Sequence, residues 1–461
     1  MGVNREKSIT FAKENRSGFL DELKELLRIP SISTDPAFEK DIRRAAEWLR
    51  TKLDRIGMVN VQIMATKGHP VVYGENLNAG EDAPTMMVYG HYDVQPADPV
   101  ELWESEAFEP EERNGNLYAR GSSDMKGQVM ASIFAIEAVM SQGALPYNIK
   151  FMLEGEEEHT SPNLEPFMKE HKDLLACDFI LNPDAGMFAA DIPTITYSLR
   201  GICSFEVHVQ GPTQDLHSGM HGGAVRNPAN ELARLIGGMH DEEWKVTLKG
   251  FYDRVRIIDD EERAELARLP IDEDAVLEEI GAPQFWGEPG YTYLEKVGTR
   301  PTLDVNGIIS GYNGEGMKTV LPSKATAKIT TRLVADQEPD EVYEGLKTYM
   351  EENADASVTW TVNYLQGNKA SMSNRDSDEI QAMSKALESV WGMRPVFNPG
   401  GGTIPAVGYM KEVLGAESVL TGFSRPDDNI HSPNEKLHLS TWYKGIDSLI
   451  HFLENLKEIH G

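Results

Sequence analysis

The sequence has little cysteine and no long apolar run, and both absences exclude whole classes of protein. Only Cys177 and Cys203 occur among 461 residues, too few for a disulfide framework. Cys203 alternates with apolar residues, so we expect a small core residue rather than a catalytic thiol. No stretch approaches the roughly 18 apolar residues of a membrane-spanning helix. The start, MGVNREKS, lacks a signal-peptide core, and we therefore expect a cytoplasmic protein.

Basic residues are also scarce relative to acidic ones. The chain has 44 lysines and arginines against 74 aspartates and glutamates, a formal net charge of −30. Because this surface repels phosphate groups, nucleic acids and anionic membranes are not expected as partners. The charge identifies no substrate, since solubility is enough to explain it. The length and the 40% hydrophobic content predict a globular protein with two or three domains.

Apolar periodicity divides the chain into two kinds of region. Residues 8–28 have a helical period, and helices then alternate with short strands, which predicts an α/β layer with a largely parallel sheet. Long alternating strands follow at 196–210 and 324–334, and they indicate an inserted α+β domain. The acidic stretch 250–289 within it has no clean period. The α/β pattern returns towards the carboxyl end.

Polar side chains follow several of the predicted strands. His91 and Asp93 come directly after an apolar strand, and because they are two residues apart on extended backbone they point to one side. Asp124 precedes a helix, a run of three glutamates follows the strand that ends at Leu153, and Asp184 follows another strand. Functional groups of parallel sheets gather at the carboxyl ends of strands. These side chains therefore become candidates for one site.

Together with His431 from a late loop, these residues have the chemistry of a two-metal centre. Two imidazoles and three carboxylates suffice if one carboxylate bridges, and mixed nitrogen and oxygen ligands favour Zn²⁺, Mn²⁺ or Co²⁺. Paired metals polarise a carbonyl and hold a hydroxide nucleophile, as amide hydrolysis requires. One of two adjacent glutamates can bind metal while the other acts as the base. Asp93 is placed to fix the tautomer of His91.

Each of these motifs also has an ordinary structural explanation when taken alone. A run of glutamates is usually a solvated turn, and Asp184 after Asn-Pro is by default a turn residue. The Asp427-Asp428 pair has the same explanation, and we assign it no ligand. The run 400–402 of three glycines lacks the Lys-Ser/Thr of a phosphate loop, so we expect it to lie close to a substrate. The joint occurrence of the motifs favours the functional interpretation.

Six motifs occur in a fixed order: GHYDVQP, GSSDMKG, EGEEE, NPDAG, LHSGMHGG and the His431 loop. In this order they resemble the co-catalytic metallopeptidase family of carnosinase, carboxypeptidase G and aminoacylase, over essentially the whole chain. LEGEEE, GGGTIP and TVLP…TTRLV are most similar to the cytosolic non-specific dipeptidase and carnosinase branch. The resemblance implies an α/β/α catalytic domain (1–197 and 369–461) with a mixed, largely parallel central sheet. It also implies an inserted ferredoxin-like α+β domain (198–368) that acts as a lid and forms a homodimer.

The resemblance further assigns the metal ligands, position by position. It makes Asp124 the bridge between two divalent ions, Zn²⁺, Mn²⁺ or Co²⁺. His91 and Asp184 complete one metal site, and Glu158 and His431 complete the other.

The catalytic and substrate-binding roles follow from the same alignment. Glu157 matches the general base and Asp93 the acid behind His91. The run of three glutamates makes the register ambiguous by one residue, and aligning 153–155 with the end of the family's strand settles it. His159 departs from the family pattern. His217 matches a histidine that reaches a neighbouring subunit's site and stabilises the oxyanion. Arg332 matches the clamp on the substrate's terminal carboxylate. Two further positions match substrate contacts: Thr319 and Thr403.

We therefore expect a cytoplasmic, homodimeric dinuclear metallopeptidase that cleaves dipeptides or short peptides with a free C-terminal carboxylate. An N-acyl amino-acid deacylase or desuccinylase would use the same metals and the same clamp. A catalytically inactive metal-binding scaffold is the alternative of another class, although it would need neither the base nor Asp93.

Overall fold

The computed structural model describes residues 5–460. The chain divides into two units, each described here by itself. The first unit comprises Met1–Tyr197, Ser373–Asn398 and Ile404–Gly461, and the second comprises Ser198–Met372 and Pro399–Thr403. Two details differ from the expected boundaries. The chain returns to the first unit at Ser373 rather than at 369, and Pro399–Thr403 belongs to the second unit.

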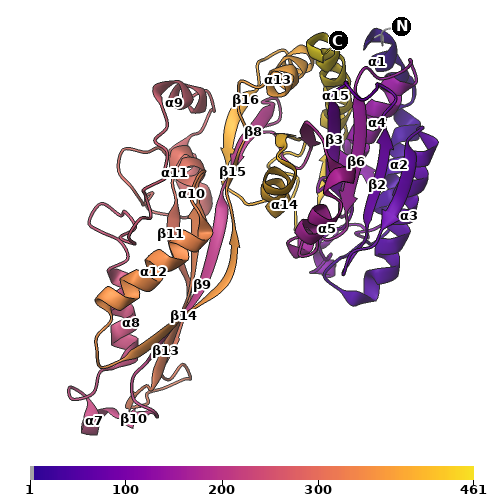
Figure 1. Ribbon diagram of the computed structural model, residues 1–461. Coiled ribbons are helices and arrows are strands. Elements are labelled where there is room, and N and C mark those ends of the chain that lie inside the picture. The colour runs from indigo at the N-terminus through magenta and orange to yellow at the C-terminus, as the bar shows by residue number, and fades with distance from the viewer. Residues whose placement is uncertain (1–4, 461) are drawn as a thin grey trace. The chain divides into compact units, whose positions relative to one another are not determined.

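A mixed sheet organises the first unit, and Figure 1 labels its strands β2, β6 and β3. Its order in this unit is β1-β2-β6-β3-β7-β17-β8, with β16 paired to β8. The last two residues of β8, which belong to the second unit, pair with β15. The central strands β6, β3, β7 and β17 run parallel, whereas β1, β2, β8 and β15 pair antiparallel. The strands are bounded as follows: β1 Val59–Met64, β2 Val71–Asn76, β3 Thr85–His91, β6 Asn148–Glu154, β7 Phe179–Asn182, β8 Thr194–Leu199, β15 Ser371–Met372, β16 Val396–Gly400 and β17 Glu417–Thr421.

Helices cover the parallel strands on both sides. Every residue of β6 is buried, and so is every residue of β3 after Thr85, which is the pattern of a parallel sheet covered on both faces. The helix α4 is buried along nearly its whole length and contacts β3. The helices of this unit are α1 Arg5–Glu14, α2 Arg16–Leu27, α3 Glu39–Arg55, α4 Lys126–Met140, α5 Leu164–Glu170, α6 Lys172–Leu175, α13 Asp378–Trp391, α14 Pro405–Tyr409 and α15 Leu439–His460.

A small three-stranded sheet also belongs to the first unit. Its order is β18-β5-β4, and the strands are β4 Glu111–Arg113, β5 Asn116–Tyr118 and β18 Lys436–His438. The chain reaches β18 directly after the loop that carries His431, and β5 lies directly before the turn that carries Asp124. The pairing of β18 with β5 therefore brings two distant segments of the sequence together.

The second unit is built on an antiparallel sheet of order β11-β13-β9-β14. Along the chain its main elements follow the order β9-α8-β11-β13-α12-β14, which is the ferredoxin-like arrangement. Cys203 lies in the hydrophobic core between this sheet and its helices, as alternation along its strand predicts. The elements are β9 Gly201–Gln210, β10 Leu216–His217, α7 Ser218–His221, α8 Pro228–Gly237, α9 Asp260–Leu266, α10 Glu273–Ile280, α11 Tyr293–Thr299, β11 Thr302–Ser310, β12 Val320–Leu321, β13 Lys324–Leu333, α12 Pro339–Asn353 and β14 Thr359–Asn368.

Among the described residues, no helix has both the length and the apolar character required to cross a membrane.

Candidate metal centre

Five candidate ligands reach one region of the first unit from the ends of its strands. His91 is the last residue of β3, and Asp184 lies two residues after β7. Asp124 lies in the turn before α4, and Glu158 lies in the short 3₁₀ helix that follows β6. His431 comes from the loop after β17. Because β3, β6, β7 and β17 are parallel neighbours, their carboxyl ends meet at one edge of the sheet.

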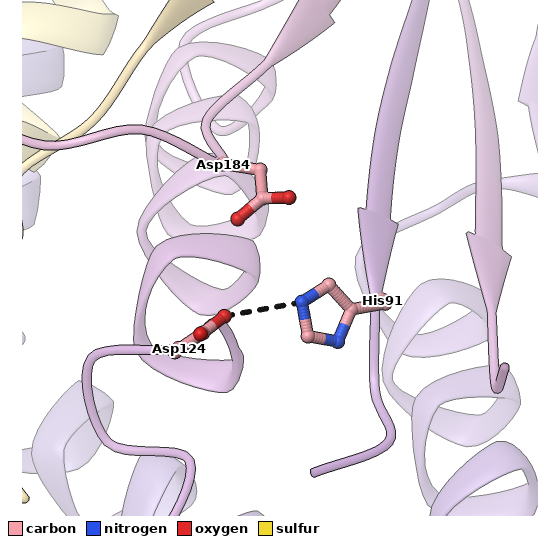
Figure 2. Close-up of side chains that lie close together, drawn as sticks. All are labelled: His91, Asp124 and Asp184. Atoms are coloured by element: carbon pink, nitrogen blue, oxygen red, sulfur yellow. Dashed lines mark hydrogen bonds and ion pairs between the residues drawn. The ribbon is translucent and has the colours of Figure 1, made fainter. Parts of the chain in front are cut away.

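His91, Asp124 and Asp184 form the first ligand group. A ligand atom from each lies within 4.8 Å of the others. The Nε2 atom of His91 is 3.2 Å from Oδ1 of Asp124, and Figure 2 shows the Asp184 carboxylate facing the same space. The His91 side chain is only 1% exposed, so this group is closed off from solvent on the histidine side.

Asp124, Glu158 and His431 form the second ligand group, with the same 4.8 Å limit between ligand atoms. The Nε2 atom of His431 lies 3.0 Å from Oδ2 of Asp124 and 3.2 Å from Oε2 of Glu158. The His431 side chain is 51% exposed, in contrast to His91. The amide of Gln95 donates to Oε2 of Glu158 at 2.7 Å and so orients that carboxylate.

The two groups share Asp124 through different oxygen atoms. Oδ1 faces His91 and Oδ2 faces His431, which is the geometry of a bridging carboxylate. The donors are imidazole nitrogens and carboxylate oxygens with no thiolate, a set that suits Zn²⁺, Mn²⁺ or Co²⁺. The residues present therefore fit a pair of divalent ions.

Crowding of buried charge shifts the pKa values of these groups. Burial raises the pKa of Asp184 to about 7, with further help from the Asp124 charge. Burial opposes charge on Asp124, but hydrogen bonds with His431 and His91 hold the pKa of Asp124 below its usual range. Hydrogen bonds with Asp124 and Glu158 raise the pKa of His431 to about 10. Burial opposes charge on His91, but hydrogen bonds with Asp124 and Asp93 raise the pKa of His91 well above its usual value. The carboxylates therefore favour the protonated form of both imidazoles.

Asp93 contacts a ligand residue of each group. Its carboxylate is fully buried, with Oδ1 3.4 Å from Nδ1 of His91. The same carboxylate accepts the backbone N–H groups of Glu157 and Glu158 at 3.3 and 3.1 Å. Asp93 therefore orients His91 and also holds the turn that carries both glutamates.

The three consecutive glutamates have different environments. Glu156 accepts hydrogen bonds from the backbone N–H of His69 and from the amide of Asn163, away from the ligand groups. Burial raises the pKa of Glu157 well above its usual value, and His91, Asp184 and Glu158 all act on its charge. Glu158 belongs to the second ligand group. The side chain of His159 is exposed.

A further acidic group lies nearby, formed by Asp427, Asp428 and His438. The two carboxylates have other partners: the Lys436 ammonium is 2.9 Å from Asp427, and the backbone N–H of Arg425 donates to Oδ2 of Asp428 at 2.7 Å. Our sequence interpretation assigned the Asp427-Asp428 pair no ligand, and that assignment stays a prediction.

The remaining predicted residues lie in the second unit and form two pairs. His217 is exposed, and its Nδ1 accepts the backbone N–H of Gly219 at 3.0 Å. The exposed Thr319 lies beside it, since the Thr319 carbonyl accepts the backbone N–H of Ser218. In the second pair, the Arg332 guanidinium donates to Oγ1 of Thr403 at 2.9 Å.

Sequence reasoning missed Arg200, Gln95 and Glu435. Burial, with the neighbouring Arg332 charge, lowers the pKa of Arg200 to about 10. The Thr403 hydroxyl joins the two arginines, because it accepts from the Arg332 guanidinium and donates to the Arg200 carbonyl. Within the part of the chain that the structure describes, neither forms an ion pair with a carboxylate. Arg200 was the one detectable from sequence, since this charged residue interrupts the predicted alternating strand 196–210. Gln95 and Glu435 lie in polar loops, where glutamine and glutamate are ordinary residues.

Comparison with known proteins gives consistent matches. The model for "Peptidase family M20/M25/M40" matches residues 87–455. The Cys-Gly metallodipeptidase DUG1 of Candida albicans is 29% identical over 458 residues, 95% of this chain and 94% of that protein. The Beta-Ala-His dipeptidase of Homo sapiens is 29% identical over 472 residues, 99% of this chain and 93% of that protein. The solved M20 family metallo-carboxypeptidase Sso-CP2 from Sulfolobus solfataricus matches with a TM-score of 0.81 and 32% identity, over 95% of this chain and 99% of that one.

Proposed function

The chain belongs to peptidase family M20/M25/M40, and from this premise we propose that it is a dinuclear metallodipeptidase. Its substrates are dipeptides or short peptides with a free C-terminal carboxylate. The observation that carries the proposal is the pair of three-residue ligand groups that share Asp124. The relatives named as dipeptidases match almost the full length of the chain, which supports the same substrate class here.

The ligand assignment follows the two groups. His91 and Asp184 hold one divalent ion, Glu158 and His431 hold the other, and Asp124 bridges them. Zn²⁺ and Mn²⁺ are the ions we expect, with Co²⁺ as a substitute. When bound, such a pair polarises the scissile carbonyl and lowers the pKa of the attacking water.

Glu157 is the residue we assign to proton transfer. It takes a proton from the attacking water and delivers it to the nitrogen of the leaving amine, so that the departing amino acid leaves as a neutral amine. Two features support this role: Glu157 is the neighbour of a ligand without being one, and burial raises the pKa of its carboxyl group. Asp93 holds the Glu157 backbone through its N–H, which keeps the base in register with the ligands.

Arg332 is assigned to the C-terminal carboxylate of the substrate. Burial and the neighbouring Arg332 charge together lower the pKa of Arg200. Two neighbouring guanidinium groups favour an anion between them, and a carboxylate matches guanidinium geometry in a bidentate manner. Thr403 supports the arrangement, because its hydroxyl accepts from Arg332 and donates to the Arg200 carbonyl. Because an internal peptide bond has no such carboxylate beside it, this recognition selects peptides that have a free C-terminus next to the cleaved bond.

His217 is assigned to the developing negative charge on the scissile carbonyl oxygen, in the active site of a second copy of the chain. Because its Nδ1 accepts a backbone N–H, the neutral ring carries its proton on Nε2, and the exposed ring can donate this proton to an oxyanion. Thr319 lies beside His217, and we assign it a contact with the substrate. The second unit is then both lid and dimer interface. Sedimentation equilibrium tests the dimer, and a monomer with full activity would contradict this role of His217.

The decisive test is a hydrolysis screen on metal-free protein reconstituted with Zn²⁺, Mn²⁺ or Co²⁺. Dipeptides, dipeptide amides, tetrapeptides and N-acetyl amino acids are supplied separately, and released amino acids are quantified. We expect dipeptide cleavage that chelator abolishes and metal restores, and no cleavage of the amides. Turnover confined to N-acetyl amino acids would identify a deacylase instead and overturn the proposal.

The same screen tests a second candidate function. The match to a metallo-carboxypeptidase at 32% identity favours activity on longer peptides with a free carboxyl end. Cleavage of tetrapeptides from the carboxyl end, at rates equal to those for dipeptides, would identify a carboxypeptidase.

A further inference from the structure

Glu435 is a buried carboxylate that our proposed function leaves without a role. Its side chain is fully buried, although it lies in the polar loop that follows His431. A charge removed from water costs several kcal/mol unless it is paired and hydrogen-bonded. The contacts that compensate this cost therefore indicate what the residue does.

All of these contacts lie in the turn that carries Asp124. Oε1 of Glu435 accepts the backbone N–H groups of Ser123 and Asp124 at 2.9 and 3.0 Å. Oε2 accepts the backbone N–H of Gly121 and the guanidinium of Arg120, both at 2.8 Å. Four donors thus converge on one carboxylate, and one of them is the amide of the bridging residue itself.

The turn has a backbone conformation that depends on such support. Gly121 adopts a positive φ of 83°, and the carbonyl of Ser122 lies only 2.0 Å from where a Cβ atom at Gly127 would be. Glycine is required at both positions for this close approach. The N–H groups of the turn point at Glu435 rather than into a regular helix or strand. Without the carboxylate they would be buried without an acceptor.

Glu435 also fixes the loop to which it belongs. Its carbonyl accepts the backbone N–H of Ala119 at 3.1 Å, and the next residue, Lys436, begins the pairing of β18 with β5. His431 lies four residues earlier, with a positive φ of 60°, a region that side chains other than glycine rarely adopt. One residue thus ties the Asp124 turn to the His431 loop.

We propose that Glu435 is a positioning residue for the shared ligand. It orients Asp124 so that one oxygen faces His91 and the other faces His431, and it holds the His431 loop at the distance where both ligand groups form. The identity of the ions rests on the proposed function, but the positioning role does not depend on which substrate is cleaved.

A simpler explanation of any effect is loss of negative charge beside the ions. Three variants separate charge from position. Glu435→Gln keeps the shape but presents an NH₂ group to two donors. Glu435→Asp keeps the charge but shortens the reach. Asp428→Asn is the matched control: it removes a buried charge whose Oδ2 accepts from the Ser123 hydroxyl and the Arg425 amide, and one amide oxygen can keep both bonds.

The experiment is a titration of the metal-free full-length variants with Co²⁺, followed by visible absorption. Outer-shell partners of metal ligands typically contribute 10–100-fold in affinity, so we expect Kd to rise about 10–100-fold in both Glu435 variants. We also expect their absorption bands to shift because the geometry at Asp124 changes. Asp428→Asn should give wild-type bands and an affinity close to wild type.

Three results would overturn the proposal. Wild-type Co²⁺ binding by Glu435→Asp would show that charge alone matters, as would equal losses in Glu435→Gln and Asp428→Asn. If neither Glu435 variant folds, the carboxylate is required by the fold rather than for positioning. Failure of the proposed function would appear differently, as wild-type protein that binds Co²⁺ with the expected spectrum and cleaves no peptide.

Discussion

The two ligand groups that share Asp124 are built in different ways. In the first, His91 ends a buried central strand and is 1% exposed. In the second, His431 lies in a loop and is 51% exposed. The first group is held by the sheet, whereas the second is held by side chains that tie loops together. The difference teaches that the central sheet positions His91 in the first group, whereas the position of His431 in the second group depends on contacts between loops.

The largest effect should come from removing Asp124, the ligand that both groups share. Asp124→Ala deprives both groups of a ligand, so we expect loss of both ions and a fall in kcat/KM of at least about 10³-fold, since metal stabilisation contributes several kcal/mol. Metal analysis of the purified variant checks the stoichiometry, and a dipeptide assay checks the rate. Retention of one tightly bound ion would mean that the groups are independent.

Removal of each histidine should sharpen the contrast. His91→Ala leaves buried carboxylates without their cation, and breaking such a pair costs about 3–5 kcal/mol, so the metal-free Tm should fall. His431→Ala should reduce metal occupancy and lower the metal-free Tm by less than His91→Ala does, because solvent screens the ion pairs of a ring that is 51% exposed. Calorimetry of both metal-free variants makes the comparison. Equal Tm losses would contradict the idea that the sheet holds the first group and that loops hold the second.

The protonation of His431 gives the exposed group its own pH dependence. Carboxylates raise the pKa of His431 to about 10, so in metal-free protein the ring is protonated at neutral pH, and an incoming ion must displace that proton. Metal affinity should therefore fall as pH falls. The stability that the protonated ring contributes to metal-free protein is present below pH 6.5 and is lost as pH rises through about 10. Calorimetric Co²⁺ titration in buffers of different ionisation enthalpy measures the released proton, and binding without proton release would contradict this.

The smallest effect concerns the outer support of the His431 loop. Asn434 has a φ of 61°, accepts the backbone N–H of Glu104 and donates to the Leu102 carbonyl. Asn434→Ala removes both hydrogen bonds and replaces a residue type that tolerates a positive φ. We expect this to reduce the stability of the loop by about 1 kcal/mol. We expect a few-fold weaker binding of one ion only. Asn60→Ala, at a similar φ of 50° in β1, is the control and should leave metal binding unchanged.

The same division explains what could be predicted from sequence. The family, the α/β fold class and the metallopeptidase class are confirmed, because strand-end motifs such as GHYDVQP combine a periodic strand with reactive side chains. Glu435 could not be found, because its partners are backbone N–H groups more than 300 residues away. The site residues predicted from sequence lie in the geometry described above, and their roles stay predictions that the experiments address.

Short elements were the other failure. The stretch 250–289 shows no clean apolar period, yet it contains α9 and α10, of seven and eight residues. Helices of about two turns show too few repeats to detect, and their N-caps, Asp259 and Asp272, are the better signal. Residues 8–28 looked like one helix, but the chain breaks at Asn15, whose amide bonds the Phe11 carbonyl.

The link between Asp124 and Glu435 spans 311 positions of the chain, and this has a consequence during synthesis. A ribosome that has translated the first 400 codons has released His91, Asp124, Glu158 and Asp184, but neither His431 nor the carboxylate that aligns the bridge. The nascent polypeptide therefore carries the carboxylates and His91 but lacks the residues that complete the second ligand group. Completion of the second ligand group is then among the last events in the maturation of the protein.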